Sequence, residues 1–221
     1  MSVAFPQVRV GEPVRCQALS VFPLFDGQQT PVEYLLSDEG IGSGSVTVEE
    51  VSDGGSVPDL LVENKGDFRV LFLEGEQLVG AKQNRVLNTS VLIAAKSKVK
   101  IPVSCVEAGR WRYRSKHFGF SGSHSPSKLR YFLKSTVSHA LNEKLGHRSD
   151  QGKVWEEVAR QQKALGASSG TSAMSDTFED FKEQVADFQQ KLHYVDGATG
   201  MAVAIGKKIV AVDMFDKAPT C

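Results

Sequence analysis

The first half of the chain consists of short apolar or alternating segments with the two-residue period of β-strands. Gly, Asn, Asp or Lys residues separate these segments at regular intervals. In chain order the predicted strands are VRCQALSVFPLF, VTVEEV, DLLVEN, DFRVLFL, EQLVGA, TSVLIAA and KVKIPVSCVE. Short strands at this spacing are typical of an antiparallel β-sandwich or a partly closed barrel.

The second half changes to the period of a helix. Apolar residues recur every three or four positions between Ser125 and Gly146, again in SDQGKVWEEVARQQKAL, and again in DTFEDFKEQVADFQQKL. This pattern predicts three amphipathic helices. The segment GASSGTSAMS before the third one is typical of a flexible linker. A shorter helix is predicted to open at Thr30 with Pro31 as its first residue, and to end at Gly40 or Gly42.

The last apolar segment is MAVAIGKKIVAVDMF. Its central Gly206-Lys207 is typical of a type II′ turn that joins two strands of a hairpin. We therefore predict an α+β fold: an antiparallel β-sandwich or partly closed barrel, then three amphipathic helices and a final β-hairpin that rejoins the sheet. We expect one domain over residues 1–221, with a β-rich part at 1–120, a helical part at 125–192 and the closing hairpin at 199–215.

Composition narrows the classes of partner. The 221 residues include 26 basic and 26 acidic ones, so no net charge attracts the chain to nucleic acid or to a membrane. Any attraction for phosphate must come from a local cluster. No apolar run approaches the roughly 20 residues of a membrane span, and the opening MSVAFPQVRV lacks the pattern of a secretory signal. We expect a cytoplasmic protein without a membrane partner.

The three cysteines are Cys16, Cys105 and Cys221. Their odd number and wide separation argue against a disulfide framework and for a reducing compartment. Neither Cys16 nor Cys105 has a His within a few residues, so the spacing predicts no metal site. The sequence indicates no particular cofactor and does not determine an oligomeric state.

The segment GEQLVGAKQNRVLN (residues 75–88) places costly polar residues between apolar strands. Lys82, Gln83, Asn84 and Arg85 offer many donors, including a planar guanidinium fork, and a turn does not need so many. The flanking strands indicate that the cluster is buried, where it needs carboxylate or ligand partners. We interpret these four residues as ligand-binding.

Glu74 and Glu76 lie on either side of Gly75 and share strand parity. If the strand continues through Gly75, both point to one face, as paired carboxylates for acid–base work would. If Gly75 bends the chain, they belong to a polar turn. Together with Glu107 they are the nearest carboxylates expected to pair with the cluster, and Glu76 is a candidate catalytic residue.

The strand KVKIPVSCVE continues an apolar face into a thiol and a carboxylate, because the two-residue period aligns Cys105 and Glu107. A carboxylate there has a raised pKa unless a cation pairs with it. Glu107 is therefore a candidate general acid or base and Cys105 a candidate catalytic thiol. The alternative is a small core residue at Cys105 and a salt bridge between Glu107 and Arg110.

The segment RWRYRSKHFGF (residues 110–120) alternates arginines with aromatic residues. Guanidinium forks bind phosphate and aromatic faces stack on bases. Arg110 and Trp111 are therefore candidate ligand-binding residues for a nucleotide or for single-stranded nucleic acid. The alternative is a half-buried strand whose aromatic residues face inward and whose arginines are solvated.

The stretch LEGEQLVGAKQNRVLNTSVLIAAKSKVKIPVSCVEAGRW, with GSVPDLLVENK upstream and DQGKVWEEV downstream, resembles the ARPP-type domain. This is the ADP-ribosylglycohydrolase- and rhodanese-phosphatase-associated protein domain, and the resemblance covers most of the chain. It implies a bacterial-type cytoplasmic domain linked by gene association to ADP-ribose or nicotinamide-dinucleotide processing, and carries over no catalytic mechanism. The characteristic polar positions correspond to Glu76, Lys82, Gln83, Asn84, Arg85, Cys105, Glu107, Arg110 and Trp111.

Three hypotheses follow for function. In the first, an enzyme or enzyme partner acts on a small phosphate-bearing ligand such as a nucleotide or ADP-ribose. Arg85 and Arg110 would then hold phosphate, Trp111 would stack on the base, and Glu107 or Glu76 would move protons. In the second, a regulatory module binds the same ligand without turnover. In the third, the polar cluster joins two sheets in a protein-interaction domain. The sequence does not decide whether the protein is an enzyme.

Overall fold

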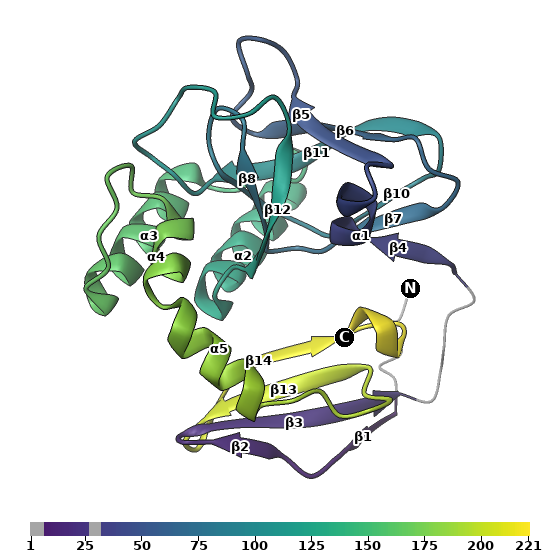
Figure 1. The fold of residues 1–221 in the computed structure, drawn as a ribbon, viewed down its shortest axis with the longest axis vertical. Coiled ribbons are helices and arrows are strands. Elements are labelled where there is room, and N and C mark those ends of the chain that lie inside the picture. The colour runs from purple at the N-terminus through teal and green to yellow at the C-terminus, as the bar shows by residue number, and fades with distance from the viewer. Residues whose placement is uncertain (1–6, 27–31) are drawn as a thin grey trace. The chain divides into compact units, whose positions relative to one another are not determined.

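The computed structural model describes residues 7–26 and 32–221 (Figure 1). The predicted helix start at Thr30 and Pro31 lies outside the described residues. Contacts within the chain group it into two compact units. The central unit is Glu33–Asp180, and the terminal unit combines Met1–Val32 with Phe181–Cys221. The expectation of one domain over the whole chain stays a prediction, and each unit is described by itself.

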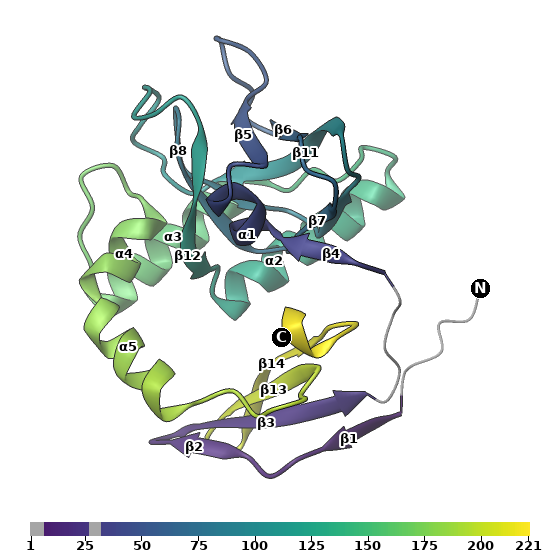
Figure 2. The ribbon, with the colours of Figure 1, turned by 45° about the vertical axis from the view of Figure 1, so that its right-hand side comes forward.

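A curled antiparallel sheet forms the main part of the central unit. Its strand order is β12-β8-β9-β11-β6-β5, and β12 at one end contacts β5 at the other (Figure 2). The strands are β5 (Val46–Glu50), β6 (Asp59–Asn64), β8 (Glu76–Gly80), β9 (Arg85–Leu87), β11 (Ser97–Cys105) and β12 (Phe118–His124). The approach of the two end strands makes the sheet a half-barrel, as the regular spacing of short strands predicts.

Alternate residues of these strands face the inside of the half-barrel and form its core. The register pairs Arg85 with Leu78 on one side and with Cys105 on the other, and it pairs Glu50 with Leu60. Paired residues share a face of the sheet, so Glu50, Arg85 and Cys105 continue the apolar interior. The core cluster contains Val46, Val48, Leu60, Val62, Val70, Phe72, Leu78, Ala81, Leu87, Ile93, Ile101, Val103 and Phe118.

A small second sheet lies beside the half-barrel in the order β10-β7-β4. Its strands are β4 (Tyr34–Leu36), β7 (Arg69–Phe72) and β10 (Val91–Ile93). Helix α1 (Ser37–Gly42) follows β4 directly and ends at one of the two predicted glycines. The helix predicted to open at Thr30 was wrong at residues 34–36, which form strand β4 and pair with β7. This tertiary pairing outweighs the local helix signal.

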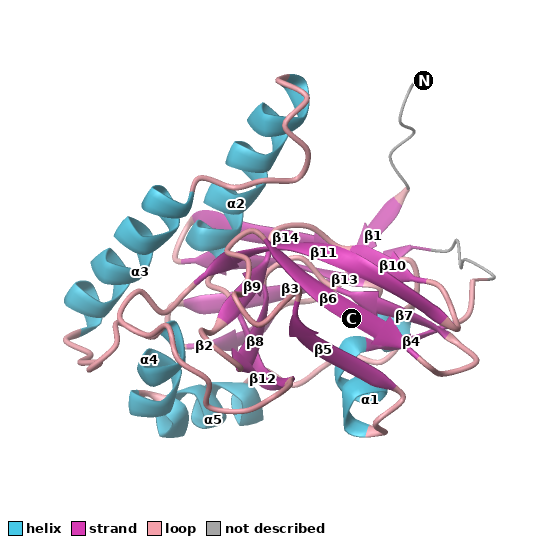
Figure 3. Cartoon of the chain, turned by 90° about the horizontal axis from the view of Figure 1, so that it is seen from above, coloured by secondary structure: helices cyan, strands magenta, loops and turns pink. Residues whose placement is uncertain are grey.

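Two helices cover the opposite face of the half-barrel sheet, α2 (Ser127–Asn142) and α3 (Gln151–Leu165) (Figure 3). Their apolar sides pack around Val86 of β9. The third predicted helix is present as two, α4 (Met174–Asp180) in the central unit and α5 (Lys182–Lys191) in the terminal unit. The break is at Phe181, whose φ of −111° and ψ of 15° depart from helical values.

The terminal unit is a sheet built from the two ends of the described chain. Its strands are β1 (Val8–Val10), β2 (Val14–Cys16), β3 (Leu19–Asp26), β13 (Gly200–Ile205) and β14 (Lys208–Met214), followed by the 3₁₀ turn η1 (Ala218–Thr220). The predicted closing hairpin is confirmed, because Ile205 pairs with Lys208 and Gly206 has the positive φ of +59° that a type II′ turn requires. The hairpin rejoins β3.

None of the helices that the described residues form is long and apolar enough to cross a membrane.

Candidate functional site

The structure brings together the two polar segments that the sequence singles out. The loop after β8 and the segment after β11 are joined by Asn84, whose backbone amide donates to Glu107 Oε2 at 3.1 Å and whose carbonyl accepts from the Val106 amide at 3.1 Å. The Gln83 side chain donates to the Glu107 carbonyl at 2.5 Å. Both segments therefore belong to one polar cluster at an end of the half-barrel.

Arg110 and Glu107 form a buried, bidentate ion pair within this cluster. Arg110 Nε donates to Glu107 Oε1 at 2.8 Å, and Nη2 donates to Oε2 at 2.7 Å. Nη1 donates to the carbonyls of Ala81 and Arg112. All three guanidinium nitrogens are thus used inside the protein. Burial acts to raise the pKa of Glu107, but hydrogen bonds from Arg110, Thr171 and the Asn84 amide lower it below its ordinary value.

The segment 166–175, predicted to be a flexible linker, is instead fastened over Glu107. Thr171 Oγ1 donates to Glu107 Oε1 at 2.8 Å, and the Thr171 carbonyl accepts from the Gly109 amide at 2.8 Å. Asn84 Nδ2 donates to Ser175 Oγ at 3.0 Å. The linker prediction was wrong because small hydroxyl residues also suit a chain that docks closely on polar groups. Thr171 and Ser175 are site residues that the sequence reasoning missed.

Arg85 lies beside this cluster, on the inner face of the half-barrel, with a side chain that is 0% exposed. Its Nη1 donates to the carbonyl and to Oε1 of Gln83 at 3.2 and 3.0 Å. Its Nη2 lies 3.5 Å from Glu50 Oε1 without hydrogen-bond geometry. Among the described residues, Nε and Nη2 of Arg85 find no hydrogen-bond acceptor. Burial lowers the pKa of Arg85, and nearby anionic groups raise it in part.

Glu50 is the carboxylate partner of Arg85, and the sequence reasoning missed it. The expected partners were Glu74, Glu76 and Glu107. The alternation in VTVEEV already placed Val46, Val48 and Glu50 on one face of a strand, and the structure buries all three. That period was the signal by which Glu50 could have been found.

Cys105 is buried next to Arg85 in the register of β9 and β11. Burial raises the pKa of its thiol to about 11, although the Arg85 charge lowers it in part. The thiol is therefore protonated at neutral pH, and the thiolate is the reactive form of cysteine. The side chain of Gln151 binds the Cys105 backbone, accepting from its amide at 2.7 Å and donating to its carbonyl at 2.8 Å.

Glu74 and Glu76 do not form a carboxylate pair, because Gly75 bends the chain with a φ of +84°. Glu74 Oε1 accepts from Arg130 Nε at 3.1 Å. Glu76 accepts from Ser37 Oγ at 2.6 Å and from the Leu73 amide at 2.9 Å. Burial raises the pKa of Glu76 to about 7. The bend gives the two carboxylates different partners. The structure therefore agrees with the polar turn rather than with paired carboxylates on one face.

Glu76 is also separated from Glu107. Glu76 is the first residue of β8, whereas Arg110, the partner of Glu107, donates to the carbonyl of Gly80 at the other end of the strand. Four residue steps of about 3.3 Å put about 13 Å between the two ends. The structure therefore does not bring Glu76 and Glu107 to one point.

The segment 110–117 forms a loop, and β12 begins only at Phe118. The alternative of a half-buried strand through this segment is wrong, because residues 110–117 form a loop around the Arg110 guanidinium. Arg110 is buried, whereas Trp111 and Tyr113 are 47% and 49% exposed, so the aromatic residues do not face inward. The ammonium of Lys82 lies 5.6 Å from the Trp111 ring centroid and 5.1 Å from that of Tyr113. These are cation–π contacts.

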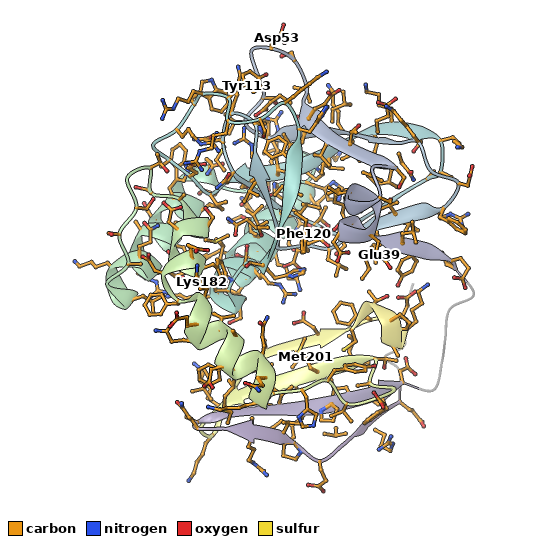
Figure 4. All side chains as sticks on the ribbon, in the orientation of Figure 1. Glu39, Asp53, Tyr113, Phe120, Lys182 and Met201 are labelled. Carbon is orange, nitrogen blue, oxygen red and sulfur yellow. The ribbon has the colours of Figure 1, made fainter. Side chains whose placement is uncertain are left out.

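A cavity of about 650 Å³ opens beside this loop. It lies between the end of β5 with its following loop and the residues after Trp111, and Figure 4 shows Asp53 and Tyr113 at this same end of the central unit. Burial raises the pKa of Tyr113, and the charges of Glu50, Asp53 and Glu49 raise it further. The lining residues are Glu49, Glu50, Val51, Ser52, Asp53, Leu61, Tyr113, Arg114, Ser115 and Lys116.

Two of the sequence-predicted residues lie close to this cavity. Lys82 donates from Nζ to the Asp53 carbonyl and from its backbone amide to Glu50 Oε1 at 3.3 Å. Trp111 lies over the Arg85 guanidinium, with 5.5 Å between Arg85 Cζ and the ring centroid. Among the described residues, no group of three or more His, Cys, Asp and Glu side chains could hold a metal ion.

Comparison with known proteins agrees with the resemblance noted from the polar motif. Residues 7–221 match the model of the ARPP-1 family, described as the ARG and Rhodanese-Phosphatase-superfamily-associated Protein domain. Neither a curated protein nor a solved structure matched the chain. Because the family model covers nearly the whole chain, the protein belongs to the ARPP-1 domain family.

Proposed function

We propose that the central unit binds a nucleotide- or ADP-ribose-type ligand in the cavity beside Tyr113. The observation that carries the proposal is the set of groups that line one space of about 650 Å³. They comprise an aromatic ring, two cations and a wall of carboxylates. A volume in this range is typical of small-molecule sites. The family's association with ADP-ribose and rhodanese-phosphatase systems supports the ligand class.

Each lining group suits one part of such a ligand. The Tyr113 ring is half exposed and offers a surface on which a base can stack. Arg114 and Lys116 are exposed cations at the same opening and would bind phosphate. The carboxylate of Asp53, an exposed residue of the same wall, accepts hydrogen bonds and therefore suits hydroxyl donors.

The residues of the polar motif act as the support of this cavity. Lys82 contacts the rings of Trp111 and Tyr113 and binds the Asp53 carbonyl, while Gln83, Asn84 and Arg110 fasten the loops beneath. Phosphate would be bound by Arg114 and Lys116, because the donors of Arg110 are already used and Arg85 is fully enclosed. On this proposal the family motif maintains the shape of the site.

On this proposal the protein binds the ligand, and the three candidate catalytic residues do not convert it. Cys105 keeps its proton at neutral pH, and Glu107 is ion-paired beneath the 166–175 segment. Glu76 lies at the far end of β8. The enzymatic alternative, in which Glu76, Glu107 and Cys105 process the ligand, is tested by incubating the protein with ADP-ribose and NAD⁺ and analysing the products by chromatography. We expect both compounds to be recovered unchanged.

Calorimetric titration of the full chain tests the binding itself. The probes are AMP, ADP, ADP-ribose, NAD⁺ and inorganic phosphate. We expect at least one of the nucleotides to bind, and we expect Tyr113→Ala to weaken binding by about tenfold or more through lost stacking. Tyr131→Ala is the matched control, since Tyr131 is a 69% exposed tyrosine on α2.

The phosphate contacts are tested separately with the double variant Arg114→Ala/Lys116→Ala. It should weaken binding of phosphate-bearing ligands, whereas Arg112→Ala, an exposed arginine of the same loop that does not line the cavity, should leave binding unchanged. If none of the nucleotides binds, or if both cavity variants bind like the wild type, the proposed function is wrong.

A further inference from the structure

The aromatic residues beside the cavity already hold a positive charge. Lys82 is 9% exposed, and its ammonium lies 5.6 Å from the Trp111 ring centroid and 5.1 Å from that of Tyr113. Among the described residues, the acceptor of its hydrogen bond is the Asp53 carbonyl. Attraction between a cation and an aromatic face is strongest where the cation has lost water. This end of the half-barrel therefore holds a cation through two ring faces and a carbonyl.

Tyr113 offers the same kind of ring face to a ligand in the cavity. It is 49% exposed and lines the cavity, so the Lys82 ammonium leaves much of the ring open. Burial raises the pKa of the Tyr113 hydroxyl, and three carboxylates of the cavity wall raise it further. They are Glu50, Asp53 and Glu49. The ring therefore lies in a negative electrostatic potential, where a cationic ring gains more from stacking than a neutral ring does.

One of these carboxylates is free to face a ligand. Glu50 is enclosed beside Arg85, and Glu49 lies 3.6 Å from Lys98 Nζ. Asp53 is exposed and lines the cavity, and its carboxylate has no hydrogen-bond or ion-pair partner among the described residues. Asp53 is therefore the carboxylate that a ligand in the cavity can reach.

The phosphates of a dinucleotide leave this carboxylate without a counter-charge. A pyrophosphate is dianionic and matches the two cations at the opening, Arg114 and Lys116. On the proposed function, the base one ribose away stacks on Tyr113. Adenine and nicotinamide occupy equivalent positions at the two ends of a dinucleotide, so position does not decide between them. Charge does, because oxidised nicotinamide is a pyridinium cation whereas adenine is neutral.

We propose that the cavity selects a nicotinamide nucleotide in its oxidised form, with the pyridinium ring stacked on Tyr113 and its charge facing the carboxylate of Asp53. This inference rests on the proposed function and names the ligand class within it. Arg114 and Lys116 bind the phosphate of any nucleotide, whereas Asp53 and Tyr113 distinguish a charged ring from a neutral one. Asp53 is then a specificity-determining residue, although it lies outside the polar motif of the family resemblance.

The wild-type protein alone supplies the first test. NAD⁺ and NADH carry the same adenosine, riboses and phosphates, but only NAD⁺ has a charged nicotinamide ring. Calorimetric titration should show that NAD⁺ binds more tightly by about tenfold or more. If NADH binds as tightly, or if ADP-ribose binds and NAD⁺ does not, the inference is wrong while the proposed function stands. If none of AMP, ADP, ADP-ribose, NAD⁺ and NADH binds, the proposed function itself fails.

The second test assigns the preference to Asp53. Asp53→Asn keeps the size of the side chain and removes its charge. The ratio of NAD⁺ affinity to NADH affinity should therefore fall by about threefold or more, through weaker binding of NAD⁺ alone. Thermal unfolding of the variant shows that it is folded before titration. Asp196→Asn, an exposed change in the terminal unit, should keep the wild-type ratio. An unchanged ratio in a folded Asp53→Asn protein would overturn the assignment.

Discussion

Arg110 donates two hydrogen bonds to Glu107, from Nε to Oε1 at 2.8 Å and from Nη2 to Oε2 at 2.7 Å. Neither side chain is more than 1% exposed. A pair of this kind, formed three residues apart in a loop, fixes the loop that carries Trp111 and Tyr113. Loss of either partner leaves a buried charge without its counter-charge, which is strongly destabilising.

The first prediction concerns this pair. Arg110→Ala should lower the free energy of unfolding by about 3–5 kcal/mol, because Glu107 is then buried without a cation. Denaturant unfolding followed by circular dichroism measures the change. The control is Arg112→Ala in the same loop, where the side chain is exposed and the change should stay within about 0.5 kcal/mol. Equal stability of the two variants would contradict the role assigned to the pair.

The second prediction concerns Arg85 and Glu50. Arg85→Ala should destabilise the protein by about 3–5 kcal/mol even without ligand, because the Glu50 carboxylate keeps its burial and loses its cation. The double variant Arg85→Met/Glu50→Leu should recover much of that loss, since apolar side chains of similar volume can replace a buried pair. An Arg85→Ala protein as stable as the wild type would show that the pair contributes little to the fold.

The third prediction is a pH dependence that originates at Glu76. The pKa of Glu76 is about 7 in the folded protein against an ordinary value of 4.5, so the folded state holds its proton more tightly than the unfolded chain does. Its contribution to stability is therefore complete below about pH 4.5 and is lost as the pH rises through 7. Glu76→Gln should gain stability relative to the wild type over that window, on the order of 2–3 kcal/mol by pH 8.

Urea unfolding at several pH values checks this sign. Glu156→Gln, an exposed change, should follow the wild-type curve at every pH. Glu107 acts in the opposite direction, because its lowered pKa gives stability that is lost as the pH falls. The difference between Glu76→Gln and wild type isolates Glu76, and a difference that does not grow between pH 5 and 8 would refute the prediction.

The fourth prediction concerns the segment over Glu107. Thr171→Val removes the hydrogen bond to Glu107 Oε1 and should cost about 1.5–3 kcal/mol of stability, as expected for a bond to a charged group. Ser168→Ala, an exposed change in the same segment, should have little effect. Limited proteolysis gives an independent measurement, because a docked segment should resist cleavage until the protein unfolds. Rapid cleavage between residues 166 and 173 would restore the flexible-linker interpretation.

The fifth prediction concerns thiol reactivity. Cys105 is buried and its pKa is raised to about 11, so it should react slowly with a thiol reagent at pH 8. Cys221 is only partly buried and should react first. Cys221→Ser should therefore remove the fast phase of labelling. If Cys105→Ser removes the fast phase instead, the thiol of Cys105 is accessible in the folded protein.

Local patterns predicted a helix or strand correctly where the apolar period of the segment matches the face that the fold buries. The helical periods gave α2 and α3, and the Gly206-Lys207 turn gave the closing hairpin. The failures lie where tertiary contacts decide. Residues 110–117 alternate like a strand, yet they form a loop because Arg110 binds the surrounding carbonyls. Composition alone could not reveal such bonds.

Only part of the candidate site could be predicted, because tertiary contacts also decide which residues meet there. The polar motif near Asn84 and Glu107 was found because its residues are unusual between apolar strands, and the structure joins them. Glu50 and Thr171 were missed because each is ordinary in its own segment. Glu50 approaches Arg85 across the half-barrel, and Thr171 is 64 residues from Glu107 along the chain. Contacts of that range cannot be read from spacing in one sequence.

The pairing of β3 with β13 has a consequence for the order of events during synthesis. The two strands are about 175 residues apart, as the hydrogen bond of Thr199 Oγ1 to the Leu24 carbonyl illustrates. The central unit is continuous in sequence and can fold as soon as it leaves the ribosome. Strand β3 must wait for β13 to be translated, and until then its free edge is open to pairing with other chains. Ribosome-bound chains that stop short of residue 200 should therefore aggregate through β3, and chains that extend past residue 214 should not.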